Sequence, residues 1–390
     1  MELIVSNTDI RGIQMVTHKH EFFFELLKAG LWEHDFVRIP FDSVELGPVF
    51  QLAKEQGVVG LVAAGLEHGH DVKVPQNSAL ELVGQTLQIE QRNKAMNAFI
   101  VRLNEKLREA GINALLIKGQ GIAQCYERPL WRTCGDVDLL LSSDSYEKAK
   151  ALLLPMGEMT EPEEAGKKHF AIRIGQWVVE LHGTLHVGLS SRVDRVLDQV
   201  QCDLFYGGKV RSWVNDKAVV LLPAADEDVV YVFAHVLQHF YKGGIGLRQI
   251  CDWCRLLYTY KESLDFGLLE QRIRRMGLMS EWRAFGTFAI KYIGMPENTF
   301  PMFGSESKVQ NSRLAKKADR ICKFIMEVGN FGQNRDKSYY DKYPYVVCKA
   351  ISAWWRVKDL CHHASIFPLD SLRFFPRIMW NGMMSAARGE

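Results

Sequence analysis

Two aspartates separated by one residue are the clearest chemical signal in this 390-residue chain. Asp136 and Asp138 lie in Gly135-Asp136-Val137-Asp138-Leu139, where an apolar run begins that is typical of a strand entering a core. Alternate residues of a strand face one side, so we expect the two carboxylates to lie together. Like charges this close raise each other's pKa unless a cation neutralises them, and hard oxygen ligands suit Mg²⁺ or Mn²⁺. The pattern predicts a divalent-metal site, although a lone D-x-D also occurs in ordinary turns.

Neighbouring segments supply partners for phosphoryl-type chemistry. A short apolar run ends in a glycine turn at Lys118-Gly119-Gln120, where backbone N–H groups and the lysine could approach a phosphate. Arg132 could hold phosphate or brace the aspartates. Glu180 interrupts a later apolar strand, and a buried glutamate needs a partner. It is therefore a candidate third metal ligand or a base for an attacking hydroxyl, unless it faces water from an edge strand.

Histidines occur in two pairs spaced by four residues, His182 with His186 and His235 with His239. Such pairs can bind zinc from a helix, but the first pair begins on a predicted strand. We favour a supporting role, in which a ring nitrogen of His182 or His235 orients a carboxylate of the site. Packing on a helix, with a bond to a backbone carbonyl, is an equal alternative for His239.

A later predicted helix carries Arg248 and Asp252, again four residues apart. The simplest interpretation is a salt bridge between them, and the functional one directs Arg248 at a triphosphate. The same helix carries Cys251-Asp-Trp-Cys254, which reads as two buried thiols and not as a redox or zinc motif.

Taken together, these motifs resemble the uncharacterised bacterial nucleotidyltransferase family of the polymerase-beta-like nucleotidyltransferase superfamily. The matching segments are Lys118-Gly119, Arg132…Asp136-Val137-Asp138-Leu139, Glu180-Leu181-His182, and the later helical residues His235, His239, Arg248 and Asp252.

The resemblance implies a mixed sheet on which Asp136, Asp138 and Glu180 bind one or two Mg²⁺ or Mn²⁺ ions. It implies attack of an acceptor on the α-phosphate of a nucleoside triphosphate, with pyrophosphate leaving. It also implies nucleotide contacts from Lys118, Gly119, Gln120, Arg132 and Arg248, with His182, His235, His239 and Asp252 as a second layer. The superfamily usually has Gly-Ser or Gly-Gly at the turn, so the phosphate contact at Gly119-Gln120 is expected to differ.

Secondary-structure patterns divide the chain into three parts and predict an α+β fold, with a mixed sheet flanked by helical regions. The resemblance implies that this sheet is a nucleotidyltransferase-fold core. The expected parts are an N-terminal helical region over 1–110, the core over 111–222 and a C-terminal helical region over 223–390. In the core we expect strands over 114–117 and 136–141, a helix over 145–154 capped by Ser143-Asp144, and two hairpins. The hairpins turn at Gly175-Gln176 and Asn215-Asp216.

Charge and composition limit the class of protein and its expected location. Hydrophobic residues make up 47% of the chain and the net charge is +2, as in an ordinary globular protein without a strong overall field. Residues 1–90 carry a balance of −7 and residues 301–390 a balance of +7. We expect no secretory signal and no membrane span, and hence a cytoplasmic protein. The basic, tryptophan-rich C-terminal segment could contact a membrane or a partner, but packing on its own domain is the interpretation we favour.

The leading hypothesis is a metal-dependent nucleotidyltransferase that moves a nucleoside monophosphate to a hydroxyl of a small molecule, a protein or an RNA. One alternative is a nucleotide-binding module without turnover, and another is a toxin-like enzyme that modifies RNA or protein. A metal hydrolase that uses the histidines is a weaker third. The sequence does not favour any acceptor or base.

Overall fold

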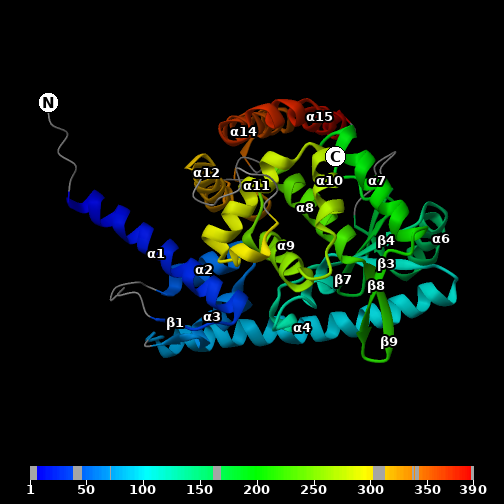
Figure 1. The fold of residues 1–390 in the computed structure, drawn as a ribbon, viewed down its shortest axis with the longest axis horizontal. Coiled ribbons are helices and arrows are strands. Elements are labelled where there is room, and N and C mark those ends of the chain that lie inside the picture. The colour runs from blue at the N-terminus through cyan, green and yellow to red at the C-terminus, as the bar shows by residue number, and fades with distance from the viewer. Residues whose placement is uncertain are drawn as a thin grey trace.

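The computed structural model describes residues 7–37, 46–70, 72–160, 168–301, 312–335, 338 and 342–387. It has a mostly helical α+β fold with one five-stranded mixed sheet flanked by helices, which confirms the predicted class (Figure 1). None of the described helices is long and apolar enough to span a membrane.

Helices dominate both ends of the chain. The N-terminal elements are α1 (Asn7–Trp32), β1 (Phe36–Val37), α2 (Leu46–Gln56), α3 (Val59–Glu67), β2 (Gly69–His70) and α4 (Gln76–Glu109). The C-terminal helices are α8 (Ala225–Lys242), α9 (Leu247–Tyr260), α10 (Phe266–Met276), α11 (Met279–Phe288), α12 (Ser312–Val328), α14 (Tyr345–Ile366) and α15 (Pro368–Ala387).

The central part holds the sheet and its connections. Its elements are β3 (Ala114–Ile117), α5 (Gly119–Ala123), β4 (Asp136–Leu141), α6 (Ser143–Leu153), β5 (Glu158–Met159), β6 (His169–Ile174), β7 (Trp177–His182), α7 (Ser191–Phe205), β8 (Val210–Asn215) and β9 (Ala218–Pro223). The sheet order is β3-β4-β7-β6-β5, and only β4 and β7 pair in parallel; β8 and β9 form a separate hairpin.

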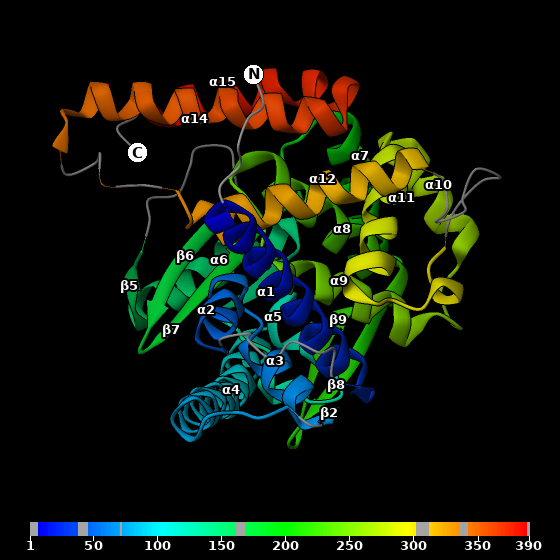
Figure 2. The same ribbon diagram turned by 90° about the vertical axis from the view of Figure 1, so that its left-hand side faces the viewer.

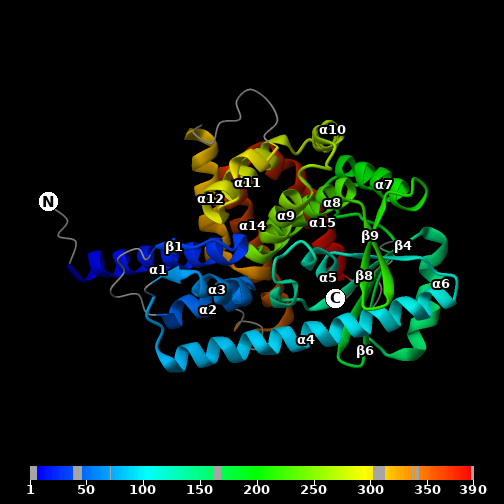
Figure 3. The same ribbon diagram turned by 60° about the horizontal axis from the view of Figure 1, so that its bottom comes forward.

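The two faces of this sheet differ in chemistry. On β4, Val137, Leu139 and Leu141 are buried in a core shared with the C-terminal half of α4. Strand alternation therefore sends Asp136 and Asp138 to the opposite face. Figure 3 shows α4 running along the sheet and on past the N-terminal helices. The long helix covers the apolar face, and the polar face is left for the site.

Two predicted details are each wrong by one residue. Helix α6 takes Ser142, and not Ser143-Asp144, as its N-cap, and Ser142 Oγ bonds Ser145 Oγ at 3.0 Å. The second hairpin turns at Asp216-Lys217, with Asp216 at φ 54°. The predicted glycine turn after β3 is present: Lys118 and Gly119 both have positive φ, and the short helix α5 begins at Gly119. Each error arises where local geometry shifts a boundary within an otherwise suitable motif.

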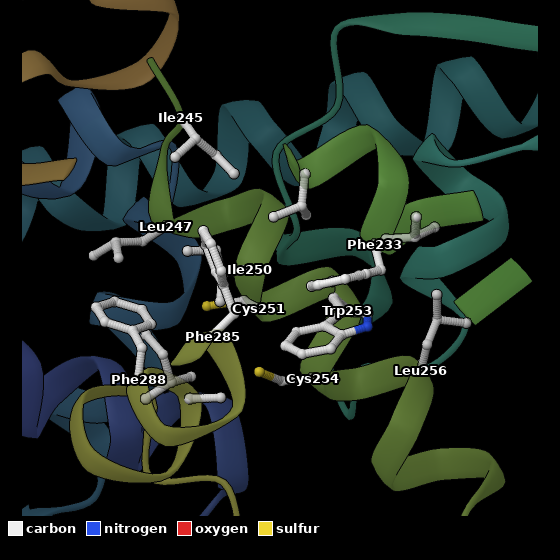
Figure 4. Packing of buried hydrophobic residues seen from close by; sticks show 14 of the residues in the cluster. Phe233, Ile245, Leu247, Ile250, Cys251, Trp253, Cys254, Leu256, Phe285 and Phe288 are labelled. Atoms are coloured by element: carbon white, nitrogen blue, oxygen red, sulfur yellow. The ribbon is translucent and has the colours of Figure 1, made fainter. Parts of the chain in front are cut away.

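The larger core joins the two helical ends of the chain. Residues of α1 to α3 and of α8 to α12 belong to one buried cluster, in which Phe233 stacks on Trp253 at 4.9 Å between ring centroids. Figure 4 shows Cys251 and Cys254 among these side chains. Both thiols are buried, and burial raises the pKa of each, as expected for structural cysteines. The predicted domain limits at 110 and 222 stay a prediction, since this core crosses them.

Candidate active site

Three carboxylates converge where β4 and β7 run side by side. Asp138 pairs directly with Glu180 in the parallel register, and Asp136 precedes Asp138 on the same face. Their oxygens offer a group of ligand atoms that all lie within 4.8 Å of one another. Asp138 is almost fully buried, whereas Asp136 and Glu180 are half-buried. Hard oxygen donors from adjacent strands, partly open to solvent, fit a divalent cation such as Mg²⁺.

Asp138 is held by two basic side chains, one directly after β3 and one on β7. Lys118 Nζ lies 2.7 Å from Asp138 Oδ1, and His182 Nε2 lies 2.9 Å from the same oxygen. Burial would lower the pKa of Lys118, but the charge of Asp138 outweighs it and raises this pKa above its usual range. Burial would also lower the pKa of His182, and the hydrogen bonds to Asp138 and Glu180 raise it. The cluster thus gathers positive charge around its most buried carboxylate.

The pKa values of the other two carboxylates shift in opposite directions. The pKa of Asp136 is raised to about 6, first by the charge of Asp138 and then by burial. Burial would raise the pKa of Glu180, but hydrogen bonds to His169 and His182 hold it well below its usual range. The repulsion between the carboxylates therefore acts mainly on Asp136, where no basic side chain fully offsets it. A cation bound beside it would relieve that repulsion.

Strain in the backbone brings Lys118 to this position. The residue directly follows β3 and has φ 58° and ψ −152°, a conformation that costs a non-glycine residue about 1–3 kcal/mol. Gly119, at φ 47°, completes the turn, and a Cβ there would lie 3.3 Å from Cys134 Sγ. The turn predicted from the sequence is present, and it directs the lysine at the aspartates.

Two predicted nucleotide-binding side chains point elsewhere. The buried Gln120 amide donates to Asn93 Oδ1 at 2.8 Å, inside the protein and away from the carboxylates. Arg132 is also buried and meets Asp252 in two hydrogen bonds, Nε to Oδ1 at 2.8 Å and Nη2 to Oδ2 at 2.6 Å. Arg132 does not brace Asp136 and Asp138 directly, as the sequence suggested; its guanidinium pairs with Asp252 instead.

Arg248 takes a different position from Arg132. Its Nη1 lies 3.9 Å from Asp252 Oδ2, so the expected pair with Asp252 is secondary to that of Arg132. The side chain is about one-fifth exposed, and its charge acts on Asp136. Arg248 is thus the arginine placed at the border of the site.

A row of side chains on α8 faces the carboxylates. Tyr231, His235 and His239 lie four residues apart on one side of the helix, and the charge of Lys118 acts on all three. His235 Nε2 and His239 Nε2 are 2.9 Å apart. Burial lowers the pKa of both imidazoles, that of His239 to about 4, so both are neutral near pH 7. Burial raises the pKa of Tyr231 to about 12, and the phenol keeps its proton.

Among the described residues, neither predicted histidine pair belongs as a pair to a group of potential metal ligands. His186 Nε2 bonds Asp198 at 2.6 Å on the surface, apart from His182. Within the described ranges, the potential metal-ligand groups are two, and both include Glu180: one with Asp136 and Asp138, one with His169 and His182.

Sequence reasoning missed His169 and Tyr231. His169 lies opposite His182 in the β6–β7 register, and its Nε2 is 3.2 Å from Glu180 Oε2. Counting cross-strand pairs outward from the predicted turn at Gly175-Gln176 places His169 opposite His182, so the sequence contained the signal for this pair. The position of Tyr231 could have been predicted from the four-residue spacing that it shares with His235 and His239.

Comparison with known proteins agrees with this geometry. Neither the curated proteins nor the solved structures gave a match. A family model described as uncharacterised nucleotidyltransferase matches residues 42–289, which include the sheet, the three carboxylates and α8 and α9. The chain belongs to this family of uncharacterised nucleotidyltransferases.

Proposed function

We propose that the protein transfers a nucleoside monophosphate from a nucleoside triphosphate to a hydroxyl acceptor, with Asp136, Asp138 and Glu180 holding Mg²⁺ or Mn²⁺. The observation that carries this proposal is the convergence of the three carboxylates from two parallel neighbours of the sheet. Family membership supports the nucleotide as the substrate class.

In the proposed reaction, the acceptor oxygen bonds to the α-phosphorus and the bond from that phosphorus to the bridging oxygen breaks. The acceptor loses its proton, and pyrophosphate leaves with the electron pair of the broken bond. A bound divalent cation would neutralise charge on the phosphate oxygens. The chain itself contributes mainly position and charge.

Each side chain then has a role that its contacts allow. His182 fixes the orientation of Asp138 through the 2.9 Å bond. The buried ammonium of Lys118 pairs with Asp138 and can bind a phosphate oxygen in its place. Arg248, at the border of the site, is the candidate for the outer phosphates. Neutral His239, next to His235 on α8, is the candidate to accept the acceptor's proton.

The histidine pair has a defined proton arrangement. His235 Nδ1 lies 3.1 Å from Gln238 Oε1, an acceptor, so this nitrogen carries the proton. A neutral His235 then accepts at Nε2, and His239 donates from its own Nε2 at 2.9 Å. The remaining lone pair of the couple is therefore on His239 Nδ1, which makes His239 the member able to take up a proton.

The test is nucleotide binding and turnover with matched variants. Wild type is incubated with each of the four nucleoside triphosphates and Mg²⁺ or Mn²⁺, and binding is followed by calorimetry and pyrophosphate by a coupled assay. The double variant Asp136→Asn/Asp138→Asn should lose metal-dependent binding. The control Asp198→Asn/Asp216→Asn changes the charge equally at two exposed positions and should bind like wild type.

Two outcomes separate the proposal from its nearest rival. Binding with pyrophosphate release supports transfer, to an added acceptor or to the protein itself. Metal-dependent binding with no pyrophosphate release under any acceptor mixture would favour a nucleotide-binding module without turnover. Salt-sensitive binding of tRNA with nucleotide incorporation would identify RNA as the acceptor.

A further inference from the structure

The last two helices form a layer on the outside of the molecule. α14 and α15 pack side by side along one edge, far from the sheet's apolar face and from α4 (Figures 1 and 2). Their inner side contacts α8 and α12. His363, Phe367 and Phe374 are buried on that side, so the packing on its own domain that the sequence favoured is present.

The outer side of the same two helices is exposed and apolar. Trp354 is 67% exposed on α14, and Leu369, Leu372 and Trp380 are 79%, 65% and 63% exposed on α15. These three α15 residues recur at helical spacing on one side. Smaller exposed apolar residues fill the outer face around them: Val347, Ala350, Ala353, Val357, Pro368 and Pro376.

Charge on this outer face, which consists of the exposed residues of 342–380, has one sign. The exposed charged residues there are Lys342 and Lys358, with the side chains of 345 and 346 not described. The two acidic residues of the segment turn inward: Asp359 is buried and lies 2.6 Å from Arg335, and Asp370 is half-buried near Glu281. The described residues of this face therefore offer mainly tryptophan, aliphatic and lysine side chains, together with Tyr343, Cys361 and Ser365, and no carboxylate.

We propose that the outer face of α14 and α15 docks the protein on an anionic lipid surface. An amphipathic helix with tryptophan and leucine on one side and lysine at its borders lies in the plane of such a surface. Tryptophans are favoured at the depth of the headgroups, and each lysine near anionic lipid adds attraction. Docking of this kind needs no spanning helix, in agreement with the described helices.

A second copy of the chain fits this face less well. A symmetric dimer through the outer face would place the lysines of both copies in an interface whose described residues include no exposed carboxylate to pair with them. An anionic headgroup layer provides the opposite charge along the whole layer. Charge complementarity thus selects the lipid surface.

The test is flotation of the full chain with phosphatidylcholine vesicles, with and without phosphatidylglycerol, at low and high salt. We expect binding to the vesicles that contain phosphatidylglycerol, and weaker binding in high salt. The variant Trp354→Glu/Leu372→Glu should bind at least about tenfold more weakly, because two apolar side chains leave the interface. Both positions are exposed, so the fold and nucleotide binding should persist.

The matched control is Leu80→Glu/Leu87→Glu on α4, at the opposite edge of the molecule (Figure 1). It also introduces two glutamates in place of two exposed apolar side chains and should bind vesicles like wild type. No binding of wild type to anionic vesicles, or equal loss in both variants, would overturn the proposal. Concentration-dependent dimers that only Trp354→Glu/Leu372→Glu abolishes would also overturn it, in favour of a second copy.

Discussion

Arg132 and Asp252 form a buried two-point ion pair that ties the segment before β4 to α9. Tyr126 Oη also donates to Asp252 Oδ1, at 2.7 Å. Residues 120 apart in the sequence are thereby fixed next to the strand that carries Asp136 and Asp138. The pair connects the sheet to the helices that cover its polar face.

Removing one partner of this pair should destabilise the fold strongly. In Asp252→Asn the guanidinium of Arg132 stays buried without a counter-charge, which typically costs about 3–5 kcal/mol. Urea denaturation measures the free energy of unfolding. The control Arg274→Ala breaks the exposed pair with Glu270 and should cost less than about 1 kcal/mol. Equal losses in the two variants would contradict the role assigned to the buried pair.

His182 should act on the site through Asp138 without being needed for the fold. We expect His182→Gln to weaken metal-dependent nucleotide binding about 10–100-fold, because the orientation of Asp138 is lost. Calorimetry measures the binding, and circular dichroism the fold. His186→Gln, four residues away and bonded to Asp198, is the matched control and should bind normally. A normal affinity in His182→Gln would remove His182 from the site.

The protonation of Glu281 should make stability depend on pH. Burial raises the pKa of this carboxyl to about 8, against an ordinary value of 4.5, and Tyr241 bonds to it at 3.0 Å. The folded state therefore holds the proton more tightly than the unfolded state. This stabilisation is fully present below about pH 4.5 and is lost as pH rises toward 8.

Glu281→Gln keeps the shape and an acceptor for Tyr241 but cannot ionise. We expect the stability of wild type to fall relative to this variant between pH 5 and pH 8, by a few kcal/mol at most. Urea midpoints at both pH values measure the difference. A constant difference across this range would show that Glu281 does not titrate there.

Alanine substitution of Gly30 tests the close approach of α1 and α3, and the same substitution at Gly84 on α4 is its control. A Cβ at Gly30 would lie 1.9 Å from the Leu61 carbonyl oxygen, so Gly30→Ala must push two backbones apart. We expect a loss of about 1–3 kcal/mol, or more, as in other overpacked cores. At Gly84, inside α4, a Cβ meets nothing within 4 Å, and Gly84→Ala should stabilise by about 0.5–1 kcal/mol. Thermal melting distinguishes these opposite signs.

The sequence predicted the strands of the core well, because their alternation and turns are encoded locally. The alternation around Asp136 and Asp138 specifies the face on which they lie, and the Gly175 turn specifies the hairpin. The direction of Gln120 and of Arg132 could not be predicted in this way. Their partners, Asn93 and Asp252, come from α4 and α9, and only tertiary packing brings these helices together.

The central claim is that Asp136, Asp138 and Glu180 bind a divalent cation together with a nucleotide. Calorimetric titration of each nucleoside triphosphate with Mn²⁺, on wild type and on Asp136→Asn/Asp138→Asn, tests it most directly. The account predicts that wild type binds at least one nucleotide only when the cation is present, and that the double variant does not. Equal binding by a folded double variant, or cation-independent binding by wild type, would contradict it.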